Sequence, residues 1–400
     1  MSKSWRRIRL GEALEVVHGY AFPSEGMSEV LTGKPIIVSI GNFDYQGGFR
    51  FNSTRVREFN GDYPKQFNLS PGDLLVAMTC QTPGGEILGL PGLVPDDGRT
   101  YLHNQRIGKV ITDPALLNVR FAYYCFLRHD VNRQLVATAS GTKILHTAPS
   151  RIGAVEIDLP SLEEQEAMAA VLAAFDDKIA ISEKIAAVSS ELISLTFQNS
   201  LARSEMATIP LPEAVAFDFG LPFASDNFNT QQKGLPLLRI RDIKSFSPQV
   251  WTTERIARDV VVSPGDVVAG MDAEFRPSFW LGAPALLNQR VLRGRPLVEG
   301  GGRSFVREVL RKPLGEIEGY KTGTTVIHLN KRDLDLSSVE IPAPDALAAF
   351  EKISEPLRGR IIIAAEESRA LAGLRDTLLP KLMFGEIRVR DAEKVVEEVT

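Results

Sequence analysis

The sequence predicts an α+β protein with two similar globular heads, separated by long helices that form an antiparallel coiled coil. Two long stretches have helical hydrophobic periodicity, one in the middle of the 400-residue chain and one near its end. The segments outside these stretches share short motifs in the same order, which indicates an internal repeat. Within the repeat, apolar runs follow Gly and Pro turns, as is typical of strands.

The first helical stretch runs from Leu159 to Ser204. Ser161 and Glu164 have the spacing of a capping box, in which each side chain satisfies a free backbone N–H at the helix start. Apolar residues then recur in steps of three and four, with one phase slip, which predicts a coiled-coil seam. The expected seam residues are Met168, Leu172, Phe175, Ile179, Ile181, Ile185, Val188, Leu192 and Leu195.

The second helical stretch runs from Asp345 to Phe384. An interior proline removes a helical hydrogen bond and clashes with the preceding turn, so we expect Pro356 and Gly359 to break this stretch into a short helix and a long one. A narrow seam on a helix of roughly 60 Å needs a long partner, which favours antiparallel packing of the two stretches. The expected stripe consists of Phe350, Ile353, Leu357, Ile361, Ala364, Ser368, Leu371, Leu378 and Leu382.

The repeat relates the two heads segment by segment. The matching pairs are Ile8–Ser24 with Ile209–Ser225, Leu69–Met78 with Val262–Met271, His103–Arg106 with Leu287–Arg290, and Ser140–His146 with Thr322–His328. The offset drifts from 201 to 182 along these pairs, so the heads share a scaffold and differ in their loops. Duplication for stability alone is the competing interpretation, but two readers of different targets account better for the loop differences.

Composition indicates a protein with ordinary cores and no membrane span. No apolar run approaches the roughly 20 residues that cross a bilayer, and the N-terminus lacks the apolar region of a secretory signal, so we expect a cytoplasmic location. Cys80 and Cys125 have no CxxC spacing, and the five histidines show no ligand spacing. We therefore expect no metal site.

The net charge of −4 is unevenly distributed. Residues 1–150 carry 16 basic against 13 acidic residues, and residues 205–344 carry 17 of each. The central helix, residues 161–204, carries 3 basic against 7 acidic residues. The acidic excess thus lies on the helix, and it does not argue against a nucleic-acid partner for the heads.

Catalytic motifs are missing from the sequence. It has no Pro-Pro dipeptide of the kind that a base-flipping methyltransferase uses, and neither Gly-Lys pair, at Gly33 and Gly108, continues as a phosphate-binding loop. The acidic pair Asp176-Asp177 with Lys178 is interpreted as a solvated helical face and not as a nuclease site. We expect the chain to be no enzyme, with the chemistry carried by other subunits.

The repeat, the long helices and the closing segment Leu374–Val389 together resemble the specificity (S) subunit of Type I restriction-modification enzymes. The resemblance covers nearly the whole chain. It is most specific in Leu159–Ile179, in LLPKL followed by GEIRV, and in the paired SPGD and SGTK/TGTT segments.

This resemblance implies that each head is a target recognition domain with a mixed α/β fold. It implies as partners double-stranded DNA, two methyltransferase (M) subunits and motor-nuclease (R) subunits, with S-adenosylmethionine, ATP and Mg²⁺ bound by those subunits and no cofactor on this chain. The expected domains are residues 1–158 and 205–344 for the two heads, 159–204 and 345–390 for the spacer helices, and 391–400 for a tail.

Candidate DNA contacts are polar side chains on loops at strand ends. Arg forks onto guanine and Asn or Gln onto adenine, while Lys, Ser and Thr hold phosphates. The candidates in the first head are Tyr20, Lys34, Ser39, Asn42, Thr79, Gln81, Lys143 and His146. Those in the second head are Arg239, Arg241, Lys244, Arg276, Lys321, Thr322 and Thr324. Each is also compatible with an ordinary loop role, and for the repeated Asn-Gln-Arg segments at 104–106 and 288–290 we favour a structural role.

Two functions remain in competition. The preferred one is a non-catalytic subunit that reads a bipartite, non-palindromic DNA target, one half per head. The alternative is a protein-interaction adaptor whose heads bind proteins and whose coiled coil is a scaffold, which the acidic composition favours slightly.

Overall fold

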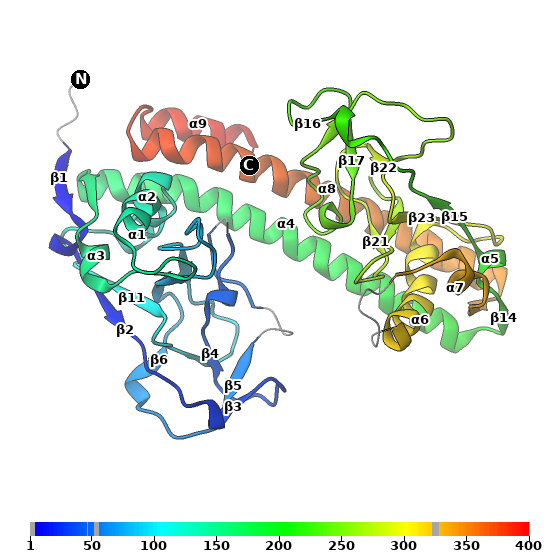
Figure 1. Ribbon diagram of the computed structural model, residues 1–400, viewed down its shortest axis with the longest axis horizontal. Coiled ribbons are helices and arrows are strands. Elements are labelled where there is room, and N and C mark those ends of the chain that lie inside the picture. The colour runs from blue at the N-terminus through cyan, green and yellow to red at the C-terminus, as the bar shows by residue number, and fades with distance from the viewer. Residues whose placement is uncertain (1–4, 46, 52–55, 322–327, 400) are drawn as a thin grey trace. The chain divides into compact units, whose positions relative to one another are not determined.

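The computed structural model describes residues 5–45, 47–51, 56–321 and 328–399. The chain divides into two compact units, residues 1–176 with 373–400 and residues 177–372. Each unit contains one head and parts of the helices α4 (Leu162–Arg203) and α8 (Pro344–Met383), which are labelled in Figure 1. Within the described residues no helix is long and apolar enough to cross a membrane.

The head of the first unit contains two main sheets. One has the strand order β2-β11-β7-β9, and its members are β2 (Leu14–His18), β11 (Ile107–Thr112), β7 (Leu74–Ala77) and β9 (Pro91–Leu93). The other has the order β3-β5-β4-β10-β6, and its members are β3 (Met27–Ser28), β5 (Arg57–Phe59), β4 (Ile36–Ile37), β10 (Tyr101–Leu102) and β6 (Asn68–Leu69). Smaller pairings join β1 (Arg6–Arg9) to β13 (Glu156–Leu159) and β8 (Thr79–Cys80) to β12 (Leu145–His146). The helices are α1 (Val119–Phe126), α2 (His129–Thr138) and α3 (Pro149–Gly153).

The head of the second unit repeats this topology. The order β15-β23-β20-β21 corresponds to the first sheet, with β15 (Val215–Phe219), β23 (Val291–Pro296), β20 (Val267–Gly270) and β21 (Ser278–Phe279). The order β16-β18-β17-β22-β19 corresponds to the second, with β16 (Phe228–Asn229), β18 (Trp251–Thr252), β17 (Leu235–Leu238), β22 (Ala285–Leu287) and β19 (Val261–Val262). β14 (Met206–Pro210) pairs with β24 (Ser338–Pro342), and the helices are α5 (Leu211–Ala214), α6 (Arg303–Lys321) and α7 (Lys331–Asp335). The predicted fold class is confirmed.

Two glycines show why the repeat constrains particular residues. Gly19 and Gly220 occupy equivalent positions after β2 and β15, where the chain passes close to the backbone of Asn104 and Asn288. A Cβ at these glycines would lie 2.3 Å and 1.9 Å from a backbone atom of the facing asparagine, closer than any side chain tolerates. The same close approach therefore requires a glycine at this position in both heads.

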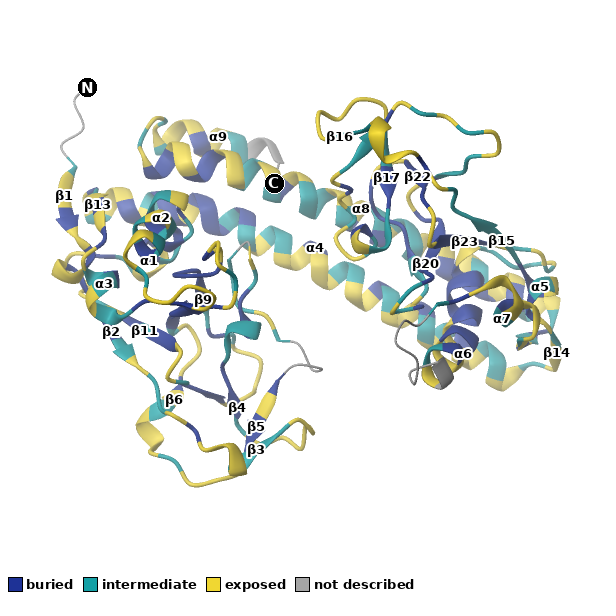
Figure 2. Ribbon diagram, in the orientation of Figure 1, coloured by how far each residue is buried: buried dark blue, intermediate teal, exposed yellow. Residues whose placement is uncertain are grey.

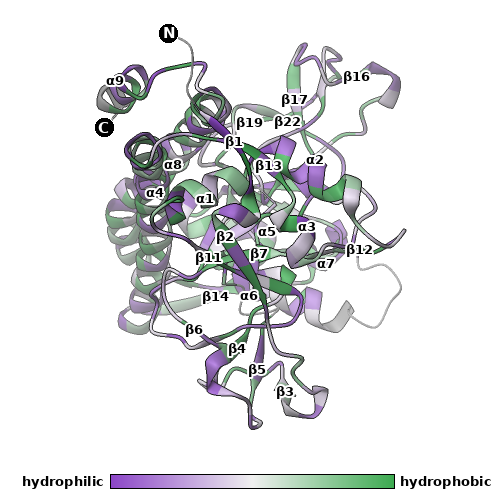
Figure 3. Cartoon of the chain, turned by 90° about the vertical axis from the view of Figure 1, so that its left-hand side faces the viewer, coloured by the Kyte–Doolittle hydropathy of each residue, from purple (hydrophilic) through white to green (hydrophobic). Residues whose placement is uncertain are grey.

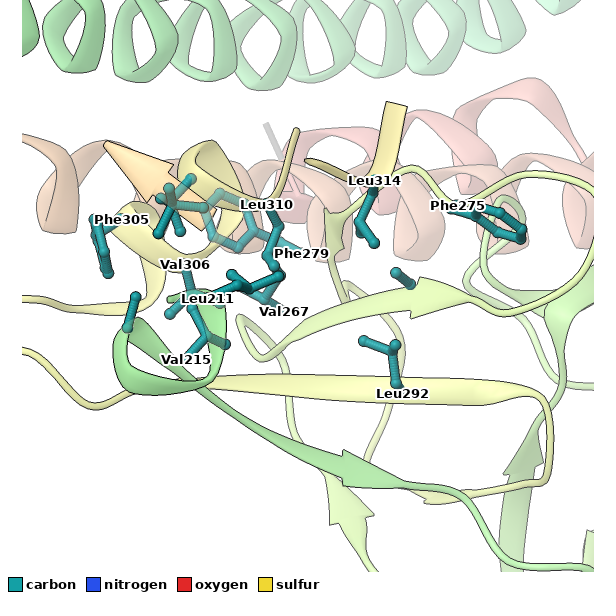
Figure 4. Packing of buried hydrophobic residues seen from close by; sticks show 14 of the residues in the cluster. Leu211, Val215, Val267, Phe275, Phe279, Leu292, Phe305, Val306, Leu310 and Leu314 are labelled. Atoms are coloured by element: carbon teal, nitrogen blue, oxygen red, sulfur yellow. The ribbon is translucent and has the colours of Figure 1, made fainter. Parts of the chain in front are cut away.

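The core of the second unit joins its head to the helices. Figure 4 shows Leu211, Val215, Phe305 and Leu310 among the side chains that pack together on the side of the strands that faces the long helices. Ile193 of α4 and Leu347 and Phe350 of α8 belong to the same buried cluster.

Within the second unit, α4 and α8 run antiparallel. Ser182 Oγ donates to the Glu367 carboxylate at 2.9 Å, and the ring of Phe197 lies 5.2 Å from that of Phe350. Residues later in α4 therefore contact residues earlier in α8, which is the pattern of antiparallel helices. In the first unit Arg375 of α8 donates from Nη1 to the Asp176 carboxylate of α4 at 2.7 Å. The expected coiled-coil pairing is confirmed within each unit.

Two details of the helices differ from the sequence predictions. α8 is continuous across Pro356 and Gly359, and the expected break is wrong. Pro356 is exposed, so the carbonyl left without its helical donor faces water, and burial of Phe350 and Ile361 on either side holds the helix together. The C-terminal residues expected to form a tail contain the helix α9 (Val389–Val399), along which hydrophobic and hydrophilic residues alternate in Figure 3.

The seam predicted on the second half of α4 is wrong. Ile181, Val188, Leu192 and Leu195 are between 44% and 58% exposed, whereas Ser182, Ser189, Ile193 and Phe197 are buried. The packed face is thus rotated by about one residue from the expected one and contains two serines. Figure 2 shows buried and exposed residues alternating along this part of α4. Ile353 of the expected α8 stripe is exposed as well, at 54%.

Candidate functional site

Three repeated segments meet at one edge of the first head. Thr79 follows the central strand β7 by two residues, and it pairs with His146 in the ribbon of β8 and β12. The backbone N–H of Met78 donates to the carbonyl of Arg106 at 3.0 Å, which brings in the Asn-Gln-Arg segment. The Thr79 hydroxyl lies 3.0 Å from His146 Nδ1. We call the set Thr79, Arg106 and His146 the first-head cluster.

The second head builds the same edge from the matching segments. A bridge pairs Asp272 with His328, and the N–H of Met271 donates to the carbonyl of Arg290 at 2.8 Å. The side chains are in contact: His328 Nδ1 lies 2.7 Å from Asp272 Oδ1, and Arg290 Nη1 lies 2.8 Å from the His328 ring nitrogens. We call the set Asp272, Arg290 and His328 the second-head cluster.

Four predicted DNA contacts of the first head lie at this edge. Gln81, Lys143 and His146 are exposed, and they come from segments more than 60 residues apart. Thr79 is only 2% exposed, and its hydroxyl is engaged with His146. The ribbon and the residues that adjoin it in the chain therefore carry a lysine, a glutamine and a histidine with exposed side chains.

The other predicted residues of the first head serve different roles. Tyr20 packs against the rings of Phe22 and Phe67, with centroids 5.0 and 5.3 Å away. Lys34 has an exposed side chain, while its backbone N–H donates to Glu58. Asn42 is 2% exposed and accepts from the backbone N–H of Ser39 at 2.9 Å, so it closes a short turn within the head.

In the second head two predicted residues, Lys244 and Arg276, lie at the loop that follows β20. Lys244 forms an ion pair of 2.6 Å with Glu274, two residues after Asp272, and Arg276 is exposed in the same loop. Arg239 closes a turn with Asp242 through a 3.0 Å bond from Nε, the equivalent of the Ser39 turn, and Arg241 is exposed. Lys321 is the last residue of α6, and its side chain and the residues Thr322 and Thr324 lie outside the described part of the chain.

Sequence reasoning missed the second-head cluster. His328 aligns with His146 in the repeat, and that alignment was the available signal for it. Arg290 received a structural interpretation, which its backbone carbonyl supports but its half-exposed side chain does not. Asp272 carries no sequence signal, because it aligns with a threonine.

Neither a group of metal ligands nor a reactive thiol is evident among the described residues. They contain no group of three or more His, Cys, Asp or Glu side chains that could hold a metal ion. Burial raises the pKa of the Cys125 thiol to about 12, so the reactive thiolate is scarce at neutral pH. Asp176 is not a solvated charge as expected, because it accepts from Tyr124 and Arg375.

A second candidate surface lies on α4 in the second unit. The exposed residues Ile181, Val188, Leu192 and Leu195 follow one another at steps of seven, four and three, and Ile185 between them is half-buried. This is the spacing of a heptad stripe, which packs against another helix in coiled coils. We call these five residues the outer stripe.

Comparison with known proteins identifies relatives of the chain. Residues 2–188 match the family described as Type I restriction modification DNA specificity domain. The Type I restriction enzyme EcoBI specificity subunit of Escherichia coli is 28% identical over 188 residues, which cover 45% of this chain but only 39% of that subunit. The MjaIX specificity subunit of Methanocaldococcus jannaschii is 23% identical over 325 residues, 72% of this chain and 73% of that one.

A solved structure shares the fold. The S subunit of a Type I restriction-modification system from M. genitalium superposes with a TM-score of 0.59 at 16% identity, over 95% of this chain and 96% of that one. At this identity the likeness concerns the fold alone.

Proposed function

Because the chain is related to the specificity subunits of Type I restriction enzymes, we propose that it is the DNA-recognition subunit of a Type I restriction-modification complex. Each head reads one half of a bipartite, non-palindromic target. The observation that carries this proposal is the edge built in both heads from the same three repeated segments, with different side chains at equivalent positions. A shared scaffold with variable residues at one edge is what two readers of different half-sites require.

The side chains at these edges suit DNA. Lys143 and Gln81 in the first head and Arg241 and Arg276 in the second are exposed. Lysine neutralises phosphate, whereas glutamine and arginine can make paired hydrogen bonds to adenine and guanine. Residues with buried side chains, such as Asn42, position the loops and are not part of the proposed surface.

The helices space the half-sites and recruit the catalytic subunits. α4 is 42 residues long, roughly 63 Å at 1.5 Å per residue, and its length sets the gap between the half-sites. The outer stripe docks an amphipathic helix of a methyltransferase subunit, since a heptad stripe exposed to water gains most by burial against a matching helix. Two methyltransferase subunits bind the chain, motor-nuclease subunits join them, and S-adenosylmethionine, ATP and Mg²⁺ belong to those partners.

The test is methylation mapping by single-molecule sequencing. DNA from cells that carry this chain with its partner methyltransferase is compared with DNA from cells that carry the methyltransferase alone. We expect a split methylation motif only when this chain is present, and we expect exchange of residues 1–150 for another head to change one half of it. Loss of both halves on exchange, or no motif from an assembled complex, contradicts the proposal, and the second result favours the adaptor function.

A further inference from the structure

The second-head cluster holds an arginine in a defined orientation. Asp272 Oδ1 lies 2.7 Å from His328 Nδ1, and the same nitrogen lies 3.1 Å from the carbonyl of Met271. Arg290 Nη1 lies 2.8 Å from both ring nitrogens of His328, so it sits over the imidazole ring. The three side chains therefore contact one another in a row, with the His328 ring between Arg290 and the Asp272 carboxylate.

The contacts to His328 involve only Nη1 of Arg290, and half of the side chain remains exposed to water. Nη1 makes the contacts to His328 and lies 3.7 Å from Asp272, and the Arg290 side chain is 50% exposed. The edge formed by Nε and Nη2 is then available for a ligand with two acceptors. Guanine presents such a pair, N7 and O6, in the major groove, and the arginine fork matches both.

The backbone around the cluster is unusual. Arg290 has a φ of +72° and Ala273, next to Asp272, has a φ of +64°. These are left-handed conformations, which cost energy for residues other than glycine and concentrate at functional sites. Glycine would relieve the cost at position 290 but would remove the guanidinium.

The first head differs at the decisive position. Thr79 occupies the place of Asp272, and its hydroxyl lies 3.0 Å from His146. No acidic side chain therefore contacts His146 within the described residues of this cluster, and the Arg106 side chain is exposed. The two heads thus share the histidine and the arginine and differ in the residue that contacts the histidine.

We propose that Arg290 contacts a guanine in the half-site of the second head, and that Asp272 and His328 position its side chain. The identity of the residue at positions 79 and 272 accordingly sets how firmly each head specifies a base at the equivalent point of its half-site. This inference rests on the proposed function, since it names residues that carry out the recognition.

The experiment measures methylation rates of the reconstituted complex on duplexes that carry each of the four bases at every position of the second half-site. We expect the wild-type motif to contain a guanine there, and Arg290→Gln to reduce the preference for it by about tenfold to a hundredfold, the discrimination that one bidentate contact supplies. Arg290→Lys should not restore the preference, because an ammonium lacks the planar fork.

The positioning role has its own variants. Asp272→Ala should weaken the preference at the same base, while Asp272→Asn, whose amide oxygen still accepts from His328, should recover most of it. The melting temperature should stay unchanged in both, since Asp272 is 31% exposed. The control is Arg258→Gln, because Arg258 is an exposed arginine of the same head with a φ of +69° that lies outside the cluster.

The outcomes separate the two proposals. A wild-type complex that assembles but methylates no split motif contradicts the DNA-recognition function itself. A wild-type motif without a guanine in the second half-site, or an Arg290→Gln profile that is unchanged or lowered equally for all four bases, overturns only the inference on Arg290. A loss of preference in Arg258→Gln of the same size would also overturn it.

Discussion

Substitution of Asp176 by asparagine should loosen the attachment of α1 to the helices in the first unit. The Asp176 carboxylate accepts from the hydroxyl of Tyr124 at 2.6 Å and from Nη1 of Arg375 at 2.7 Å. Tyr124 is 2% exposed, and the Arg375 side chain is 13% exposed. Burial lowers the pKa of Arg375, but the bonds to Asp176 and Asp376 outweigh it and raise the pKa overall.

The free energy lost in Asp176→Asn can be worked out from the two hydrogen bonds that the carboxylate accepts. A hydrogen bond to a charged group contributes about 1.5–3 kcal/mol. Asparagine keeps one acceptor for Tyr124 and loses the ionic bond to Arg375, and water reaches the partly exposed site. We therefore expect a loss of about 2 kcal/mol, which corresponds to roughly 30-fold faster local opening.

Hydrogen exchange measured by mass spectrometry is the suitable assay, because it reports each element separately. Peptides from α1 (Val119–Phe126) should exchange roughly 30-fold faster in Asp176→Asn, while those from α6 in the second unit should not change. Asp177→Asn, at the exposed neighbouring position, is the matched control. Unchanged protection of α1, or an equal effect of the control, would refute the reasoning.

Three further predictions concern the second unit. Pro356→Ala should stabilise it by about 1–3 kcal/mol in thermal unfolding, because alanine restores the helical hydrogen bond at an exposed site; a lower melting temperature would contradict this. Burial raises the pKa of Asp218, but hydrogen bonds from Arg295 and Arg293 outweigh this effect and hold the pKa below 3.8. The ionised carboxylate therefore stabilises the folded state above about pH 4, and this stabilisation is lost as the pH falls through the lowered pKa. Asp218→Asn should therefore flatten the decline of the melting temperature in acid, and an unaltered acid profile would argue against it. Leu192→Glu should abolish co-purification of the methyltransferase subunit without unfolding the chain, whereas Gln198→Glu, exposed on the same helix, should not; retained binding by Leu192→Glu would exclude the outer stripe as the docking site.

Periodicity and repetition made most of the fold predictable. The capping box at Ser161 places the start of α4, and the matched segments predicted two heads with one topology. The continuity of α8 across Pro356 was not predictable, because local propensity favours a break and only the packing on both sides overrides it. Strand pairings between distant segments also required the structure.

The candidate site was predictable only in part. Thr79 and His146 are predictable as candidates because they lie at strand ends in repeated segments, and the ribbon brings these two together. For Arg290 the sequence favours a structural role, and the Arg290 carbonyl performs one by accepting from Met271. Side-chain and backbone roles at one residue cannot be separated from the sequence.

The error in the α4 seam carries information about function. A helix that only spaced two heads would need a single apolar stripe, facing its own partner helix. α4 instead has a packed face that includes Ser182 and Ser189 and a second, more apolar face in water. Small polar residues allow the two helices to pack closely but bury little apolar surface, whereas four residues of the outer stripe remain 44% to 58% exposed to water. The proposed docking of a partner helix on the outer stripe accounts for this second face, whereas the packed face accounts only for the contact within the chain.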